Sequence, residues 1–217
     1  MKGTLQLSIV VVANDHNPTI LNPDFLIIQG IVPSDWGWKL ASPPLTTPPL
    51  SQVKYDSGVS ITVESNKLQV SDERSSSVAE SRIAGIVTKY VENLPHVRYI
   101  SVGNNFAQFI DLEEPSNYIH RRFIKSGSWE RDLISASLKL AYPLSGGRLV
   151  LSIDGAKRVE VVGDKSVQID GLLATANFHR TVESGRAPKD QIVNGVAQLV
   201  DDFKKFQTMI NEVVGLE

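Results

Sequence analysis

The densest group of side chains able to bind an anion is a basic run near the middle of the chain. His120, Arg121, Arg122 and Lys125 lie close together in the sequence. Guanidinium groups bind phosphate and carboxylate oxygens in a bidentate manner. The basic run therefore predicts an anion-binding site or a contact with an acidic partner segment. The alternative is a solvent-exposed helix face, balanced by the acidic residues just before it.

A second candidate for chemistry is an acid–base pair, because Asp15 directly precedes His16. Neighbouring residues of a strand point to opposite faces, however, and the flanking asparagines and proline are typical of a turn. If the protein is an enzyme, we expect a hydrolase or a phosphate-handling enzyme. It would use either Asp15 and His16 or the three residues His120, Arg121 and Arg122.

Other catalytic and metal-binding patterns are missing from the sequence. The four histidines do not stand at zinc-ligand spacing, and the chain has no cysteine for a thiolate, a disulfide or a metal site. The glycine-rich segment 145–148 joins two expected strands, whereas a phosphate-binding loop leads into a helix. No Gly-x-Ser-x-Gly elbow is present. We therefore predict no metal ion and no cofactor.

Composition is that of an ordinary folded protein, with 217 residues, 41% hydrophobic and 21% charged. The net charge of −2 argues against a nucleic-acid-binding protein, which would neutralise many phosphates. The apolar residues of segment 5–12 are interrupted by Gln6 and Ser8, which favours a strand over a signal peptide. No apolar run approaches membrane-spanning length. We expect a cytoplasmic protein without a membrane partner.

Two long amphipathic helices must organise the fold, over residues 75–94 and 187–214. In the second, apolar residues recur at alternating steps of four and three, which places them on one face of a helix. A face of this length must pack against an equally long surface, and a sheet provides one. The residues of this face are Ile192, Val196, Leu199, Phe203, Phe206, Ile210 and Val213.

Alternating or β-branched segments predict strands along most of the remaining chain. Asn22 and Pro23 favour a short helical turn at 23–29, and a short helix is expected at 115–125. Turns are expected at 65–66, 145–147 and 154–155, and a turn or a bulge at 103–105. The expected strands are 4–13, the hairpin 52–71, and segments 96–103, 106–112, 134–142, 147–153, 158–162 and 167–179.

This order of elements predicts an α+β fold, an antiparallel sheet with the two long amphipathic helices packed on one face. It also suggests two similar strand–strand–strand–helix halves, about 1–112 and 133–217, joined by 113–132. We expect a single domain over 1–217. The alternative is two small domains divided near residues 113–132.

The proline-rich arm, residues 14–51, is the segment with the least regular pattern. It holds seven of the eleven prolines, so no long helix or strand can run through it. Its many apolar side chains, among them Phe25, Trp36 and Trp38, argue against disorder. We predict an ordered, extended arm whose tryptophans either anchor it to its own domain or bind a partner.

The sequence favours a non-enzymatic protein-interaction or scaffold subunit over an enzyme, because nothing converges on a nucleophile, a metal or a cofactor loop. We expect Phe25, Trp36 and Trp38 of the arm to contribute the contact. The first candidate partner is a second copy of the chain in a homo-oligomer. The alternative partner is a different protein that receives the arm by strand addition or in an aromatic-lined groove.

Overall fold

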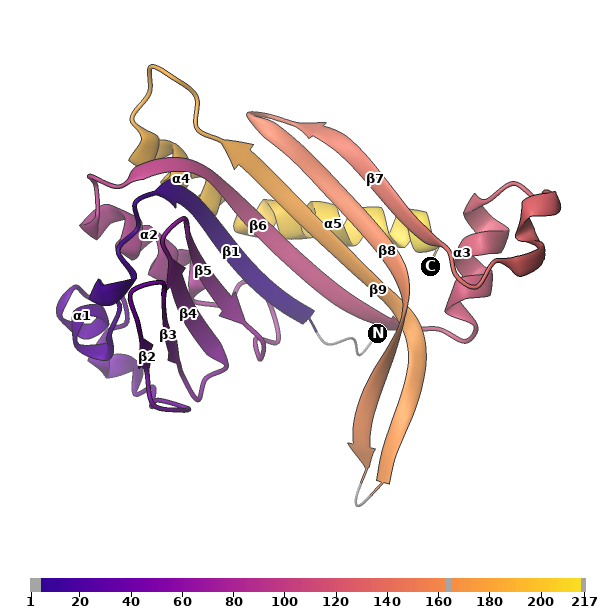
Figure 1. Ribbon diagram of the computed structural model, residues 1–217, viewed down its shortest axis with the longest axis horizontal. Coiled ribbons are helices and arrows are strands. Elements are labelled where there is room, and N and C mark those ends of the chain that lie inside the picture. The colour runs from indigo at the N-terminus through magenta and orange to yellow at the C-terminus, as the bar shows by residue number, and fades with distance from the viewer. Residues whose placement is uncertain (1–4, 163–164, 216–217) are drawn as a thin grey trace.

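The computed structural model describes residues 5–162 and 165–215, apart from the side chains of Trp129 and Val162. Its centre is one nine-stranded antiparallel sheet in the order β2-β3-β4-β5-β1-β6-β9-β8-β7 (Figure 1). The strands are β1 Leu5–Asn14, β2 Leu45–Thr46, β3 Leu50–Lys54, β4 Val59–Glu64, β5 Lys67–Asp72, β6 Arg98–Asp111, β7 Ser137–Leu144, β8 Gly147–Val162 and β9 Lys165–Thr181. The α-helices are α1 Pro23–Ile28, α2 Ile83–Asn93, α3 Pro115–Phe123, α4 Pro188–Ala197 and α5 Leu199–Val214, and the 3-10 helices are η1 Pro18–Ile20, η2 Ser34–Trp36 and η3 Ser128–Asp132.

Apart from the two-residue edge strand β2, the strand order is symmetric about the central pair β1 and β6. Each central strand is flanked by a three-strand meander, β5-β4-β3 on one side and β9-β8-β7 on the other. Each meander leads into helix, α2 after β5 and α4–α5 after β9. The topology therefore repeats three meander strands followed by helix, with β1 and β6 in equivalent places, so that the second half begins with β6 at Arg98, whereas the halves expected from the sequence place residues up to 112 in the first.

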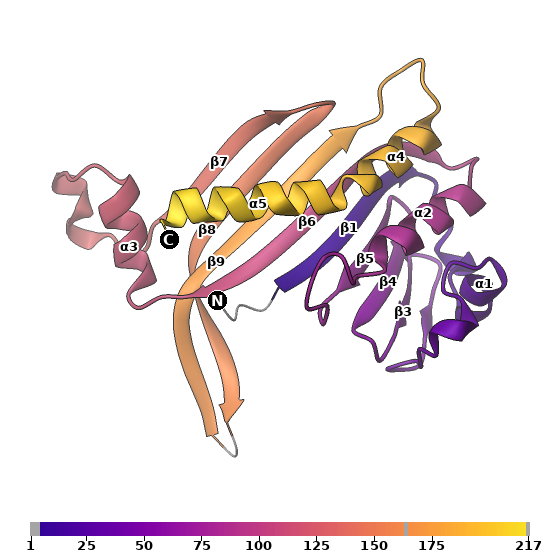
Figure 2. The ribbon, with the colours of Figure 1, turned by 180° about the vertical axis from the view of Figure 1, so that it is seen from behind.

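Alternation along the strands separates a dry face of the sheet from a wet one. Leu7, Ile9, Val11 and Ala13 of β1 are buried, while the residues between them are partly exposed. The β6 residues opposite these four are buried as well, namely Phe106, Asn104, Val102 and Tyr99. The dry face contacts α2, α4 and α5, which lie together on one side of the sheet, the side toward the viewer in Figure 2. This confirms the α+β antiparallel sheet with its long helices on one face.

The last helix is broken where the sequence predicts one continuous helix. Gln198 ends α4 and begins α5. At this break α4 approaches β6 so closely that a Cβ atom on Gly195 would lie 2.4 Å from Cγ1 of Val102. Ile192, Leu199, Phe206 and Ile210 are buried as expected, whereas Phe203 is only partly buried against the same core. The helix expected at 75–94 is shorter than predicted and begins at Ile83.

Two predicted turns are wrong, because both lie inside long strands. Residues 103–105 continue β6 without interruption. Here the buried Asn104 amide donates hydrogen bonds to the Gly195 carbonyl oxygen of α4 and to the Asp202 carboxylate of α5, which are distant in the sequence. Residues 154–155 continue β8, where Gly155 passes close to the hydroxyl oxygen of Ser116 in α3. In both places the glycine permits close approach of another element and does not mark a turn.

Candidate functional site

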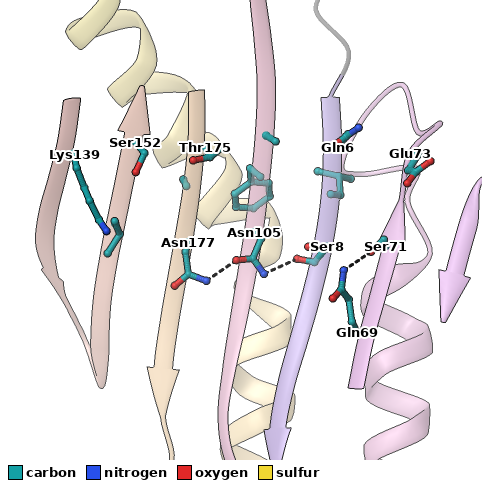
Figure 3. Close-up of a pocket in the computed structure, with 15 residues that line it drawn as sticks. Gln6, Ser8, Gln69, Ser71, Glu73, Asn105, Lys139, Ser152, Thr175 and Asn177 are labelled. Atoms are coloured by element: carbon teal, nitrogen blue, oxygen red, sulfur yellow. Dashed lines mark hydrogen bonds between the residues drawn. The ribbon is translucent and has the colours of Figure 1, made fainter. Parts of the chain in front are cut away.

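The wet face of the sheet carries a shallow hollow of about 420 Å³ in its middle (Figure 3). Its floor is made by β1, β6 and β9, and its walls come from the strands on either side. The polar side chains around it are carboxamides and hydroxyls with two charged groups, namely Gln6, Ser8, Gln69, Ser71, Glu73, Asn105, Lys139, Ser152, Thr175 and Asn177.

Hydrogen bonds between neighbouring strands already engage the central amides of this hollow. The Asn177 amide donates to the Asn105 carboxamide oxygen, and the Asn105 amide donates to the Ser8 carbonyl oxygen at 3.4 Å. Lys139 and Glu73 line opposite walls, on β7 and after β5. No histidine lines the hollow, and no hydroxyl there has a general base beside it among the described residues. The hollow therefore offers hydrogen-bond donors and acceptors from several neighbouring strands.

The proline-rich arm is folded against the β3–β4 end of the sheet. Asn22 caps α1 as predicted, since its side-chain oxygen accepts a hydrogen bond from the Phe25 backbone at 2.8 Å. Backbone hydrogen bonds join residues 39 and 41 to residues 56 and 54. The arm is held from below by side chains that are at most 3% exposed, namely Leu21, Leu26, Ile31 and Val32. Its apolar residues thus give it an ordered structure.

The two tryptophans of the arm form an aromatic row that is neither fully buried nor fully exposed. The ring centroids of Trp36 and Trp38 are 4.8 Å apart, and Trp38 lies 5.4 Å from Tyr55. The Arg82 guanidinium carbon lies 4.3 Å above the Trp36 ring, in cation–π geometry. Phe25 is also half-buried. One side of each aromatic group therefore anchors the arm while the other remains accessible.

Large aliphatic side chains on the same arm face solvent. Ile28 is 77% exposed, and Ile27, Leu40 and Leu45 are each more than 40% exposed. A single exposed aliphatic residue is ordinary, whereas several on one ordered segment make that segment a candidate contact surface. We call Ile27, Ile28, Trp36, Trp38, Leu40 and Leu45 the arm surface.

The basic run lies on α3 and just after it, and Arg121 and Arg122 line one surface hollow together with Glu113 and Glu114. His120 pairs with Glu130, with 3.1 Å between Nε2 and Oε2. Arg122 donates from Nε to the Val213 carbonyl oxygen at 2.9 Å, next to the C-terminal end of α5. Arg121 and Lys125 are exposed. Two of the four side chains, His120 and Arg122, are thus held by contacts within the protein. Arg122 stabilises the end of a helix.

Asp15 and His16 point in opposite directions. Asp15 adopts a left-handed backbone conformation with a φ of 63° and forms an exposed ion pair with Arg98. His16 is 4% exposed and lies about 6 Å from the rings of Tyr90 and Tyr99. Neither imidazole nitrogen has a hydrogen bond of ordinary geometry. Burial lowers the pKa of His16, and the neighbouring Val11 backbone offsets part of that shift.

A buried charge pair that the sequence does not reveal joins α5 to the sheet. Asp202 is 5% exposed and accepts two hydrogen bonds from the Arg180 guanidinium, at 2.6 and 2.7 Å. The Asn104 amide donates to the same carboxylate at 2.8 Å and to the Gly195 carbonyl oxygen at 3.0 Å. These partners are 22 to 98 positions apart, so no local pattern marks them. The cluster fixes the α4–α5 break against β6 and β9.

No family model matches the chain, and no curated protein matches it. Within residues 5–162 and 165–215, no helix is long and apolar enough to cross a membrane. The same residues contain no group of three or more histidine or acidic side chains placed to hold a metal ion. The evidence for function therefore comes from the surfaces of the molecule described above.

Proposed function

We propose that this protein is a non-enzymatic protein-interaction or scaffold subunit that binds another protein chain through the arm surface. The observation that carries the proposal is the combination of a firmly anchored arm with exposed apolar groups. An ordered segment pays little conformational entropy on binding, so accessible tryptophans and aliphatic groups on it contribute efficiently to affinity. Aromatic groups that are anchored on one side are typical of binding hot spots.

The arrangement of polar groups favours this reading over an enzyme. Asp15 and His16 face opposite sides of the chain, and the basic run is divided between an acidic neighbour and a helix end. Asp15 and His16 do not converge on a common point where a substrate atom would react, and the hollow lined by Arg121 and Arg122 also contains the carboxylates of Glu113 and Glu114. The proposal includes a cytoplasmic location and, as the first candidate partner, a second copy of the chain. A different protein is the alternative partner.

The test is co-purification from the native host of a tagged chain together with a second, differently tagged copy. The variant is Ile28→Glu, because this side chain is 77% exposed and its replacement leaves the core intact. We expect the wild type to retain a protein partner or the second copy. The amount that co-purifies with the variant should be at least ~10-fold lower, because a charge buried at an interface costs more than ~1.4 kcal/mol of binding free energy.

A matched control separates the arm from the rest of the surface. Val200 on α5 is 42% exposed and lies outside the arm, so Val200→Glu adds the same charge elsewhere and should retain the partner. The double variant Trp36→Ala and Trp38→Ala should lose it, provided that circular dichroism shows a native fold. If Ile28→Glu and the tryptophan variant retain everything that the wild type binds, the arm is not the contact surface.

A further inference from the structure

Strands β8 and β9 continue as a two-stranded ribbon beyond the edge of the body. The ribbon projects away from the sheet in both views (Figures 1 and 2). Strand β7 pairs with β8 only as far as Asp154, and β6 pairs with β9 only from Gly171 onward. The ribbon's valines are exposed, with Val159 at 59%, Val161 at 74% and Val167 at 45%. A two-stranded ribbon of this kind is marginally stable in water and gains from a further partner strand.

The other sheet edges carry residues that prevent pairing, and the ribbon does not. The edge strand β2 has two residues and is flanked by the proline pairs 43–44 and 48–49. The opposite edge strand, β7, contains Pro143. Proline and very short strands block edge-to-edge association. Segment 155–162 of β8 contains neither device, and its exposed β-branched residues favour pairing.

We propose that the outer edge of β8, residues 157–161, pairs with the same edge of a second copy of this chain around a two-fold axis at Val159. Antiparallel pairing centred there sets Arg158 of each chain opposite Glu160 of the other copy, and Val159 opposite its own equivalent. The pairing is therefore complementary in charge at two positions and apolar at its centre. Opposite charges and β-branched pairs directly across neighbouring strands are stabilising.

The backbone of β8 has the orientation that this register requires. A two-residue turn joins Leu144 to Gly147, and the register of β8 shows no bulge against β7 or β9. Because hydrogen-bonding direction alternates along an antiparallel strand, the odd-numbered residues of β8 direct their N–H and C=O groups toward the β7 side. Beyond Asp154 that side has no partner strand in the described chain. Residues 157, 159 and 161 thus present donors and acceptors to a second copy.

The two charged side chains that this register would pair, Arg158 and Glu160, already form contacts within their own chain, where the Arg158 guanidinium lies 3.2 Å from the Asp111 carboxylate at the end of β6. Arg158 and Glu160 project from the same face of the ribbon and are 2.9 Å apart at their nearest atoms. The Arg158 guanidinium carbon also lies 5.1 Å from the centre of the Phe109 ring, which limits its motion. The competing edge of β9 is less available, because the Leu112 backbone already donates to the Asp170 carbonyl oxygen. The outer edge of β8 is therefore the better pairing surface.

Light scattering on the full chain tests the proposal directly. We expect the molar mass to rise with concentration from the chain mass of 23.8 kDa toward twice that value. Glu160→Arg sets arginines opposite arginines and should weaken dimerisation at least ~10-fold. Arg158→Glu should do the same with acidic pairs. An equimolar mixture of the two variants should dimerise again, because each arginine then meets a glutamate.

Two further measurements keep the test decisive if Arg158→Glu does not fold. Glu92→Arg on α2 makes the same charge change at an exposed site outside the ribbon and should dimerise like the wild type. Val159→Cys introduces the chain's only cysteine, and a short bis-maleimide should link two copies through it. A wild type that stays at 23.8 kDa overturns the proposal, as does a Glu160→Arg variant that dimerises fully.

The outcome is independent of the proposed function, because the arm and the ribbon are different surfaces. Loss of the dimer in Glu160→Arg with retention in Ile28→Glu assigns self-association to the ribbon. The reverse result assigns it to the arm and contradicts the ribbon proposal. In the first case the arm surface is left for a different protein.

Discussion

The two halves of the sheet have the same strand order but use their connecting segments differently. In the first half, the segment between β1 and β3 folds back on the sheet and buries Leu21, Leu26 and Ile31 there. In the second half, the segment between β6 and β7 forms α3 at the edge, and Ile134 within it is 95% exposed. The second meander also extends into the ribbon. The first half thus presents a folded apolar surface, and the second presents an open strand edge.

One topology thus carries two different kinds of surface. Exposed apolar groups on an anchored arm suit a side-chain interface, whereas unpaired backbone on a ribbon suits strand addition. The two halves of the sheet also differ in the residues of their hydrophobic cores. Phe106 of the second half packs with Phe178, Phe203 and Phe206, with ring centroids 5.5 to 5.7 Å away, while aliphatic residues dominate beneath the first meander.

The largest expected effect on stability tests this contrast between the cores. Phe206 is fully buried, so Phe206→Ala should lower the free energy of unfolding by about 3–5 kcal/mol. Val87→Ala under the first meander removes fewer buried atoms and should cost about 1–2 kcal/mol. Urea denaturation measures both. Equal losses in the two variants would contradict the idea that the second half depends on its aromatic cluster.

Repeating apolar residues made the general architecture predictable, and long-range contacts explain what was missed. The spacing of Ile192, Leu199 and Phe206 predicts a helix covering a sheet, and the structure confirms this. The break at Gln198 depends on the approach of Gly195 to Val102, which lies far away in the sequence. The exposed and buried sides of the arm residues likewise follow from tertiary packing, which local sequence does not encode.

A smaller effect compares the buried carboxylates of the two halves. Asp202→Ala leaves the Arg180 guanidinium, with 16% of its side chain exposed, without its partner and should cost about 3 kcal/mol. Asp72 is 4% exposed but accepts only neutral donors, from the Ser81 hydroxyl and the backbone of Arg74 and Ser75. Asp72→Ala should therefore cost less, about 1–2 kcal/mol. Thermal and urea unfolding should rank the variants in that order, and the reverse ranking would contradict the comparison.

A pH-dependent effect is expected from both halves, because burial lowers the pKa of His16 in the first and of His179 in the second. Burial keeps the pKa of His16 below its usual 6.5 in the folded chain, so the unfolded chain binds the additional proton more readily. The stability from neutral His16 is therefore complete above pH 6.5 and is lost as pH falls through the lower folded-state pKa. Urea midpoints between pH 7.5 and 5.5 should fall for the wild type and fall less for His16→Leu, which retains His179. If the urea midpoints of the wild type and of His16→Leu depend on pH in the same way, His16 does not take up a proton on unfolding.

The central claim is that the arm surface contacts another protein chain, and photo-crosslinking in the native host tests it most directly. A benzophenone amino acid replaces Ile28 on the arm, and in a control chain it replaces Thr208, which is exposed on α5. We expect a discrete crosslinked product of higher mass from position 28 and none from position 208. The central claim is contradicted if position 28 gives no crosslinked protein, or if both positions give the same products in equal yield.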